Sequence, residues 1–83
     1  MPPRLPPISG RAVVRLLERL GYVIVRQRGS HIRMRKITEL GEHNITVPAH
    51  RTMARGTLND ILNRVSLWNS IPKEALTDML KEL

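Results

Sequence analysis

The chain has 83 residues, no cysteine, and 14 Lys and Arg against 7 Asp and Glu, which gives a net charge of +7. A chain of this length buries only about 60% of the surface that it exposes when unfolded, so it forms one small domain. The absence of cysteine excludes disulfides and thiolate metal sites. Because no apolar run approaches the roughly 18 residues of a membrane-spanning helix, we expect a soluble, cytoplasmic protein that does not bind membranes.

The positive charge is concentrated in the first half of the chain. Residues 1–36 carry nine Lys and Arg and one acid, a net charge of +8, whereas residues 37–83 carry five bases and six acids, a net charge of −1. Such a one-sided field attracts polyanions and speeds encounter with them. Eleven of the fourteen bases are Arg, whose guanidinium suits bidentate contact with phosphate. The charge therefore indicates a nucleic-acid partner.

The first predicted elements are an extended lead-in and a helix. Residues 1–8 contain too many prolines to be helical. Ser9 is the predicted N-cap of a helix that ends near Leu20, with Gly21 just past its end. The helix has one buried stripe at the spacing i, i+3, i+4, i+7, made of Val13, Leu16, Leu17 and Leu20. A second face carries Arg11, Arg15 and Arg19, which form either a solvated surface or a cationic ridge for phosphates.

Two antiparallel strands are predicted next. "YVIVRQ" is rich in β-forming residues, "RG" is the turn, and "SHIRMRK" returns as the partner strand. Successive side chains of a strand point to opposite faces, so Ile32 and Met34 share one face. His31, Arg33 and Arg35 share the other. If the apolar pair faces the core, His31 lies on an open face beside two arginines.

The third strand is predicted to be short. "ITELGEHN" (37–44) is interpreted as a polar connection in which His43 is solvated. "NITVP" follows as a strand with Ile45 and Val47 directed inward, and Pro48 ends it.

Two more helices are predicted after this strand. Thr57 starts the first of them, and Asp60, three residues later, completes a capping box. Its buried side comprises Leu58, Ile61, Leu62 and Val65. "SLWNSIP" (66–72) interrupts the pattern, and a last helix starts at about Ile71. Two roles are open for its apolar face, which either closes the core or forms a homodimer contact.

The order of these elements predicts an α+β fold with two layers, in which the helices cover one face of a three-stranded antiparallel sheet. The α-β-β-β-α order is followed by an additional C-terminal helix. We expect an extended segment at 1–8, the main domain at 9–67, and a helical extension at 68–83 that packs on that domain.

Three blocks of the sequence resemble the HicA family of mRNA interferase toxins. The blocks are "LPPISGRAVVRLLERLGYVIVRQRGSHIRMR", "ITVPAH" and "GTLNDILNRVSL", in the family's order over about residues 5–67. The resemblance implies a fold like a double-stranded-RNA-binding domain, metal-independent cleavage of mRNA without a cofactor, and inhibition by a HicB-like antitoxin. The family's functional histidine, in the G-S-H step, corresponds to His31.

His31 is therefore the predicted catalytic residue, as the general acid and base of an endoribonuclease. RNA carries its own nucleophile, the 2′-hydroxyl, and imidazole transfers protons near neutral pH. Three scattered histidines without cysteine predict no metal site. The predicted RNA contacts are Arg11, Arg15, Arg26, Arg28, Ser30, Arg33, Arg35, Lys36 and His50.

Several alternatives stay open at this point. Ser30 either contacts RNA or bonds the turn backbone, and a role as nucleophile is disfavoured because the predicted strand turns it away from His31. His50 either contacts phosphate or holds a loop. The whole protein is alternatively a non-catalytic module that binds double-stranded RNA by shape and phosphate contact. A HicB-like antitoxin is expected to cover the His31 face and to present acids to Arg33 and Arg35.

Overall fold

The first helix, α1 (Gly10–Arg19), begins and ends where the sequence predicts. The Ser9 hydroxyl accepts a hydrogen bond from the Ala12 backbone N–H at 3.1 Å, which caps the helix. Gly21 follows the helix with a φ of +102°, a conformation that glycine adopts without strain. The computed structural model describes residues 6–83, so most of the expected extended segment at 1–8 lies outside the described residues.

The three strands form one antiparallel sheet in the order β1-β2-β3. They are β1 (Val23–Arg28), β2 (His31–Thr38) and β3 (Gly41–Pro48). The pairing of β2 with β3 is regular from His31 opposite Pro48 to Thr38 opposite Gly41. The pairing of β1 with β2 has an irregularity between Ile24 and Arg26, which leaves Val25 without an opposite partner.

The predicted polar connection at 37–44 is wrong, because most of it belongs to β2 and β3. The turn is confined to residues 39 and 40. The Thr38 hydroxyl closes it by donating to the Gly41 carbonyl at 2.9 Å and accepting from the Leu40 N–H at 3.1 Å. The segment reads as polar because one face of this hairpin is open to solvent.

The second helix, α2 (Arg55–Asn69), is longer than predicted at both ends. The capping box is wrong, since Thr57 and Asp60 both lie inside the helix and its N-cap, Ala54, makes no side-chain hydrogen bond. The predicted interruption at 66–72 is shorter in the structure, because residues 66–69 are helical and only 70–72 separate α2 from the next helix. The four apolar residues predicted to be inward are buried.

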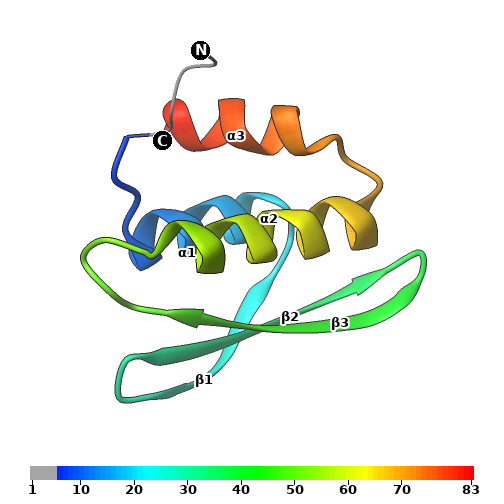
Figure 1. Ribbon diagram of the computed structural model, residues 1–83. Coiled ribbons are helices and arrows are strands. Elements are labelled where there is room, and N and C mark those ends of the chain that lie inside the picture. The colour runs from blue at the N-terminus through cyan, green and yellow to red at the C-terminus, as the bar shows by residue number, and fades with distance from the viewer. Residues whose placement is uncertain (1–5) are drawn as a thin grey trace.

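The helices lie in two tiers on one face of the sheet, as Figure 1 shows. α1 and α2 pack against the sheet, and α3 (Lys73–Lys81) lies across their far side. Leu76 and Leu80 of α3 are buried, so this helix closes the core. The α+β fold with helices on one face of a three-stranded antiparallel sheet is thus confirmed, and no helix or strand within residues 6–83 covers the opposite face of the sheet. Within residues 6–83, no helix combines the length and apolar character needed to cross a bilayer.

Candidate nucleic-acid interface

His31 is the first residue of β2 and lies on the uncovered face of the sheet. Ile32 and Met34 are buried against the helices, while His31, Arg33 and Arg35 are exposed. The alternation predicted for this strand is confirmed. In the ladder His31 is opposite Arg28 of β1 and Pro48 of β3.

The backbone around His31 is fixed by contacts between three segments. Gly29 gives the β1–β2 turn a φ of +58°, and the Ser30 carbonyl accepts a hydrogen bond from the Ala49 N–H at 2.5 Å. The His50 carbonyl accepts from the Gly10 N–H at 2.9 Å, which joins the same segment to the start of α1. A side chain at Gly10 would collide with the carbonyl of Pro48. His31 therefore projects from a turn that is held against α1 and the end of β3.

Arginines surround His31 on this face. Residues directly opposite in a ladder project from the same side of a sheet, so Arg28 accompanies His31. Arg26 is opposite Arg33, because the irregularity at Val25 shifts the register of β1. Like charges directly opposite each other destabilise a sheet. We call the group formed by His31, Arg26, Arg28 and Arg33 the cationic face.

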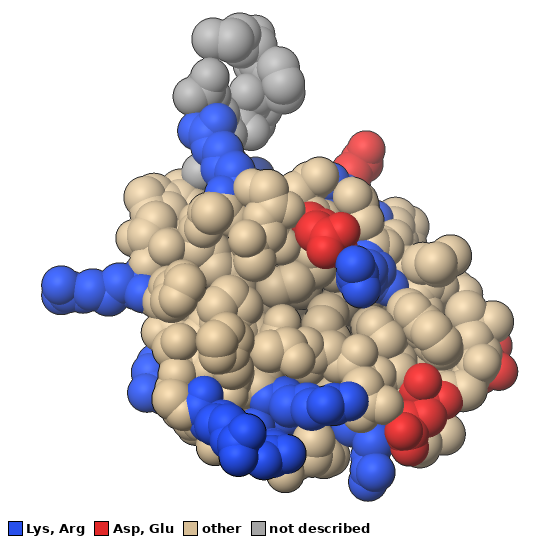
Figure 2. All heavy atoms as spheres, turned by 60° about the horizontal axis from the view of Figure 1, so that its bottom comes forward, with Lys and Arg blue, Asp and Glu red and all other residues tan. Residues whose placement is uncertain are grey.

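No carboxylate within residues 6–83 lies within 4.0 Å of the three arginines of the cationic face. Arg35, one step further along β2, differs because its Nη1 is 3.7 Å from Oε1 of Glu42. Both of these side chains are about half exposed, so solvent weakens the pair. Figure 2 shows basic side chains gathered at one end of this side of the molecule and acidic ones toward the other. The cationic face thus has charge available for a polyanion.

Two polar side chains of β3 also lie on this face, and neither is among the RNA contacts predicted from the sequence. Thr46 is opposite Arg33 and Asn44 is opposite Arg35, and both are exposed. The sequence does indicate this position for Asn44 and Thr46. Ile45 and Val47 are predicted to face the core, so the residues that alternate with them must point outward.

Several predicted RNA-binding residues lie elsewhere. Arg11 and Arg15 are exposed on α1, in the helical layer, and Arg15 borders a shallow hollow with Glu18 and Leu83. Ser30 and His50 are exposed at the His31 end of the sheet. The structure therefore brings Arg26, Arg28 and Arg33 together with His31, and does not place Arg11 or Arg15 on the same face.

Lys36 lies on the helix-facing side of β2, opposite to His31. Its Nζ donates a hydrogen bond to Oδ1 of Asn69 at 2.5 Å and lies 5.8 Å from the centre of the Tyr22 ring. This contact joins β2 to the last turn of α2.

A comparison with known protein families matches a large part of this chain. The model of the family described as "HicA toxin of bacterial toxin-antitoxin" matches residues 10–67. The chain belongs to the HicA toxin family. No curated protein and no solved structure matches it. Family membership supports the role of a toxin and, in general terms, of a nuclease, and it implies an antitoxin of the HicB type as a partner.

The part of this HicA chain that matches the family contains α1, the sheet and most of α2, and so includes the whole cationic face. α3 and residues 6–8 lie outside the matched range. The resemblance seen in the sequence is thereby confirmed at the level of the family.

The prediction that His43 is solvated is wrong. Its side chain is only 5% exposed, on the helix-facing side of β3. Nδ1 of His43 is 2.6 Å from the hydroxyl of Tyr22, and the ring is stacked on that of Trp68 with 4.7 Å between the ring centres. Burial, with a smaller contribution from the positive charge of Arg64, lowers the pKa of His43 below its ordinary value. His43 therefore belongs to the interior of this toxin.

Proposed function

We propose that the protein is an endoribonuclease toxin that cleaves mRNA in the cytoplasm, with His31 as its single general acid and base. The proposal does not call for a metal ion or another cofactor. One observation supports it: the exposed imidazole of His31 lies at the start of β2 with Arg26, Arg28 and Arg33, on a face that no other element of the described part of the chain covers.

The chemistry follows from what RNA provides. His31 accepts the proton of a 2′-hydroxyl while that oxygen attacks the adjacent phosphorus. The bond from phosphorus to the 5′-oxygen of the next nucleotide breaks, and that oxygen takes up a proton from imidazolium or water. The products are a 2′,3′-cyclic phosphate and a 5′-hydroxyl. A positioned proton-transfer group contributes about 10²- to 10⁴-fold to such a rate.

The arginines have a separate role in this proposal. Negative charge grows on the phosphoryl oxygens during the attack, and guanidinium groups already in place stabilise it. Arg28 is directly opposite His31, so it is placed to contact the reacting phosphate. Arg26 and Arg33, which form the next outward-facing pair along the ladder, bind a neighbouring phosphate. Arg35 contributes less, since Glu42 shares its charge.

The remaining predicted contacts depend on how the RNA runs. Ser30 and His50 lie at the His31 end and contact RNA that continues past the β1–β2 turn. Arg11 and Arg15 contact only RNA that extends around the edge of the sheet to α1. Lys36 can bind RNA only if its hydrogen bond to Asn69 breaks.

We further propose that a HicB-type antitoxin neutralises the toxin by covering the cationic face. Carboxylates of the antitoxin would then contact Arg33 and Arg35, and His31 would be closed to RNA. Co-purified complex should therefore neither bind nor cleave RNA, and addition of salt should weaken the complex.

The deciding experiment compares wild type with His31→Ala on RNA in the presence of a metal chelator. Cleavage should fall by about 10²- to 10⁴-fold, whereas RNA affinity should change by no more than about twofold. Mass spectrometry of the fragments should find 2′,3′-cyclic phosphate ends. If wild type binds double-stranded RNA and never cuts any RNA, the non-catalytic module is correct instead.

A further inference from the structure

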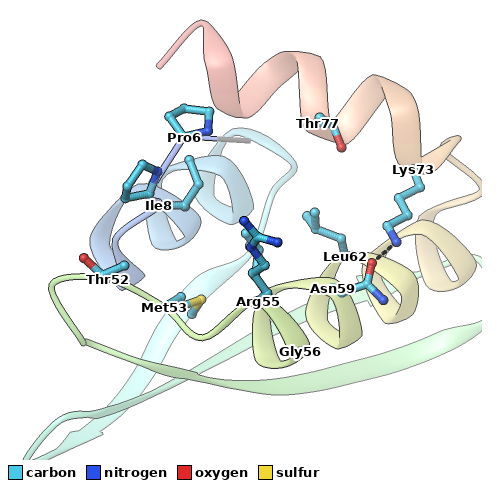
Figure 3. Close-up of a pocket in the computed structure, with 12 residues that line it drawn as sticks. Pro6, Ile8, Thr52, Met53, Arg55, Gly56, Asn59, Leu62, Lys73 and Thr77 are labelled. Carbon is cyan, nitrogen blue, oxygen red and sulfur yellow. Dashed lines mark hydrogen bonds between the residues drawn. The ribbon is translucent and has the colours of Figure 1, made fainter. Parts of the chain in front are cut away.

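A groove lies on the helical side of the molecule, away from the cationic face. Its walls are α2, α3, residues 6–8 and the loop before α2, and its volume is about 610 Å³ (Figure 3). Buried apolar side chains line it, namely Ile8, Met53, Leu58 and Leu62. This volume falls in the range of sites that hold ligands or short peptide segments.

The charged residues that line this groove, Arg55 and Lys73, are both basic. Arg55 extends into it from α2, and Lys73 reaches across from α3 to Oδ1 of Asn59 (Figure 3). None of the described residues that line the groove is Asp or Glu. The positive end of α2 opens at the same place, because Ala54 offers no side-chain cap to the first N–H groups. The groove is thus complementary to an apolar segment that carries carboxylates.

Part of the groove lies outside the region that matches the HicA family. The matched region, residues 10–67, supplies the α2 wall. Pro6 and Ile8 on one side, and Lys73 and Thr77 on the other, come from outside it. Two of the walls of the groove therefore come from segments that the family model does not cover.

We propose that the groove binds an acidic, apolar segment of the antitoxin and so determines which antitoxin pairs with this toxin. The identity of the partner rests on the proposed function. RNA is a poor occupant because the lining is mainly apolar, and a second copy is disfavoured because each copy carries +7.

Such a contact complements the one on the cationic face. An antitoxin segment in the groove would hold the partner at a second place, remote from His31. Two linked contacts raise affinity without any change at the catalytic residue, since the second contact forms within the complex. Selection between related antitoxins can then reside in the groove alone.

The test introduces a bulky side chain at the groove and measures antitoxin binding. Gly56 lines the groove at the start of α2, and a Cβ at this position meets no atom within 4 Å, so Gly56→Trp adds an indole at the edge of the groove without displacing the backbone. The matched control is Asn63→Trp, which adds the same side chain to an exposed position of α2 outside the groove. Calorimetry of the full chain with the HicB-type antitoxin from the same operon gives the dissociation constants.

We expect Gly56→Trp to weaken antitoxin binding at least tenfold and Asn63→Trp to leave it within about twofold. The double charge reversal Arg55→Glu with Lys73→Glu should also weaken binding and reduce its dependence on salt. RNA cleavage by the isolated toxin should be unchanged in all three variants. Because cleavage is measured without antitoxin, an inactive wild type would contradict the proposed nuclease activity without affecting the test of the groove.

Three results would overturn the inference. The first is wild-type antitoxin affinity in Gly56→Trp. The second is a loss of RNA binding in the charge reversal while antitoxin binding persists, which would assign the groove to RNA. The third is a wild-type dimer in sedimentation that Gly56→Trp converts to a monomer, which would assign the groove to a second copy.

Discussion

Two histidines on neighbouring strands of one sheet have opposite environments. His31 is exposed among arginines, whereas His43 is enclosed between Tyr22 and Trp68. The difference arises from the side of the sheet to which each points, because one side faces the helices and the other faces solvent. The chemical nature of the residue does not distinguish a candidate catalytic group from a structural one here; its place in the strand register does.

The surroundings of His43 form a connected hydrogen-bond network. Nδ2 of Asn69 donates to the Tyr22 hydroxyl oxygen at 2.9 Å, which leaves the hydroxyl proton for Nδ1 of His43. Lys36 donates to the other side of the same amide. Within residues 6–83, no buried side-chain polar atom lacks a hydrogen-bond partner. The network fastens the β2–β3 hairpin to the end of α2, while the cationic face makes few internal contacts.

The largest effect on stability is expected from replacing the buried histidine, His43. His43→Ala takes away a ring that stacks on Trp68 and leaves the Tyr22 hydroxyl without its acceptor. The free energy of unfolding should fall by about 2–4 kcal/mol. Urea denaturation measures this, with His31→Ala as the matched control, which should change stability by less than about 0.5 kcal/mol. Equal destabilisation by both variants would contradict the assignment of a structural role to His43 and an exposed, non-structural position to His31.

The second prediction concerns pH. The pKa of His43 is lowered in the folded state, so the unfolded chain binds this proton more readily. The contribution of His43 to stability is complete above about pH 6.5, the ordinary value in the unfolded chain, and is lost as the pH falls toward the lower folded value. One such group changes the free energy of unfolding by at most about 1.4 kcal/mol per pH unit.

Thermal unfolding at pH 7.5 and pH 5.5 measures this dependence. His43→Gln, which keeps an acceptor for Tyr22 and does not titrate, should lose most of the difference between the two pH values. His31→Ala should retain it. If the stability of His43→Gln still depends on pH as that of the wild type does, another titrating group is the cause.

The third prediction compares Arg33 and Lys36 on the two sides of β2. Arg33→Ala should weaken RNA binding by about 1 kcal/mol and lower the salt dependence by about one phosphate contact. Lys36→Met should leave RNA affinity and its salt dependence unchanged and destabilise the fold by about 1 kcal/mol, because Asn69 loses its donor. Fluorescence anisotropy at several salt concentrations, with urea denaturation beside it, separates the two effects. A loss of RNA affinity in Lys36→Met would show that Lys36 leaves Asn69 to bind RNA.

The sequence predicts those parts of the fold in which a local pattern is decisive. α1 has a cap, an apolar stripe and a terminal glycine, and β2 alternates without interruption from His31 to Arg35, so the sequence locates α1 and the first part of β2. The exposed position of His31 followed from this alternation. These signals require no knowledge of distant partners.

The errors have a common cause in contacts between residues far apart in the chain. His43 and Tyr22 are 21 residues apart, and Asn69 and Tyr22 are 47 apart. Without these partners, His43 reads as a polar loop residue and α2 reads as ending before Trp68. The groove was missed for the same reason, because residues 6–8 meet α3 only in the folded chain. Sequence patterns indicate which face of an element is buried, but not what is buried against it.

The smallest expected effect tests the border of the cationic face, where Arg35 is paired with Glu42. An ion pair between half-exposed side chains contributes about 0.2–1 kcal/mol, so Glu42→Gln should hardly change the free energy of unfolding. The variant frees Arg35 for phosphate and removes a negative charge beside the proposed RNA site, so RNA affinity should rise by about twofold at low salt and less at high salt. The matched control is Glu74→Gln on α3, which removes the same charge from the helical side and should leave RNA affinity unchanged. The net charge changes equally in both variants. A rise in RNA affinity for Glu42→Gln alone therefore locates the RNA on the open face of the sheet. An equal rise in both variants would instead show that only the overall charge of the protein matters.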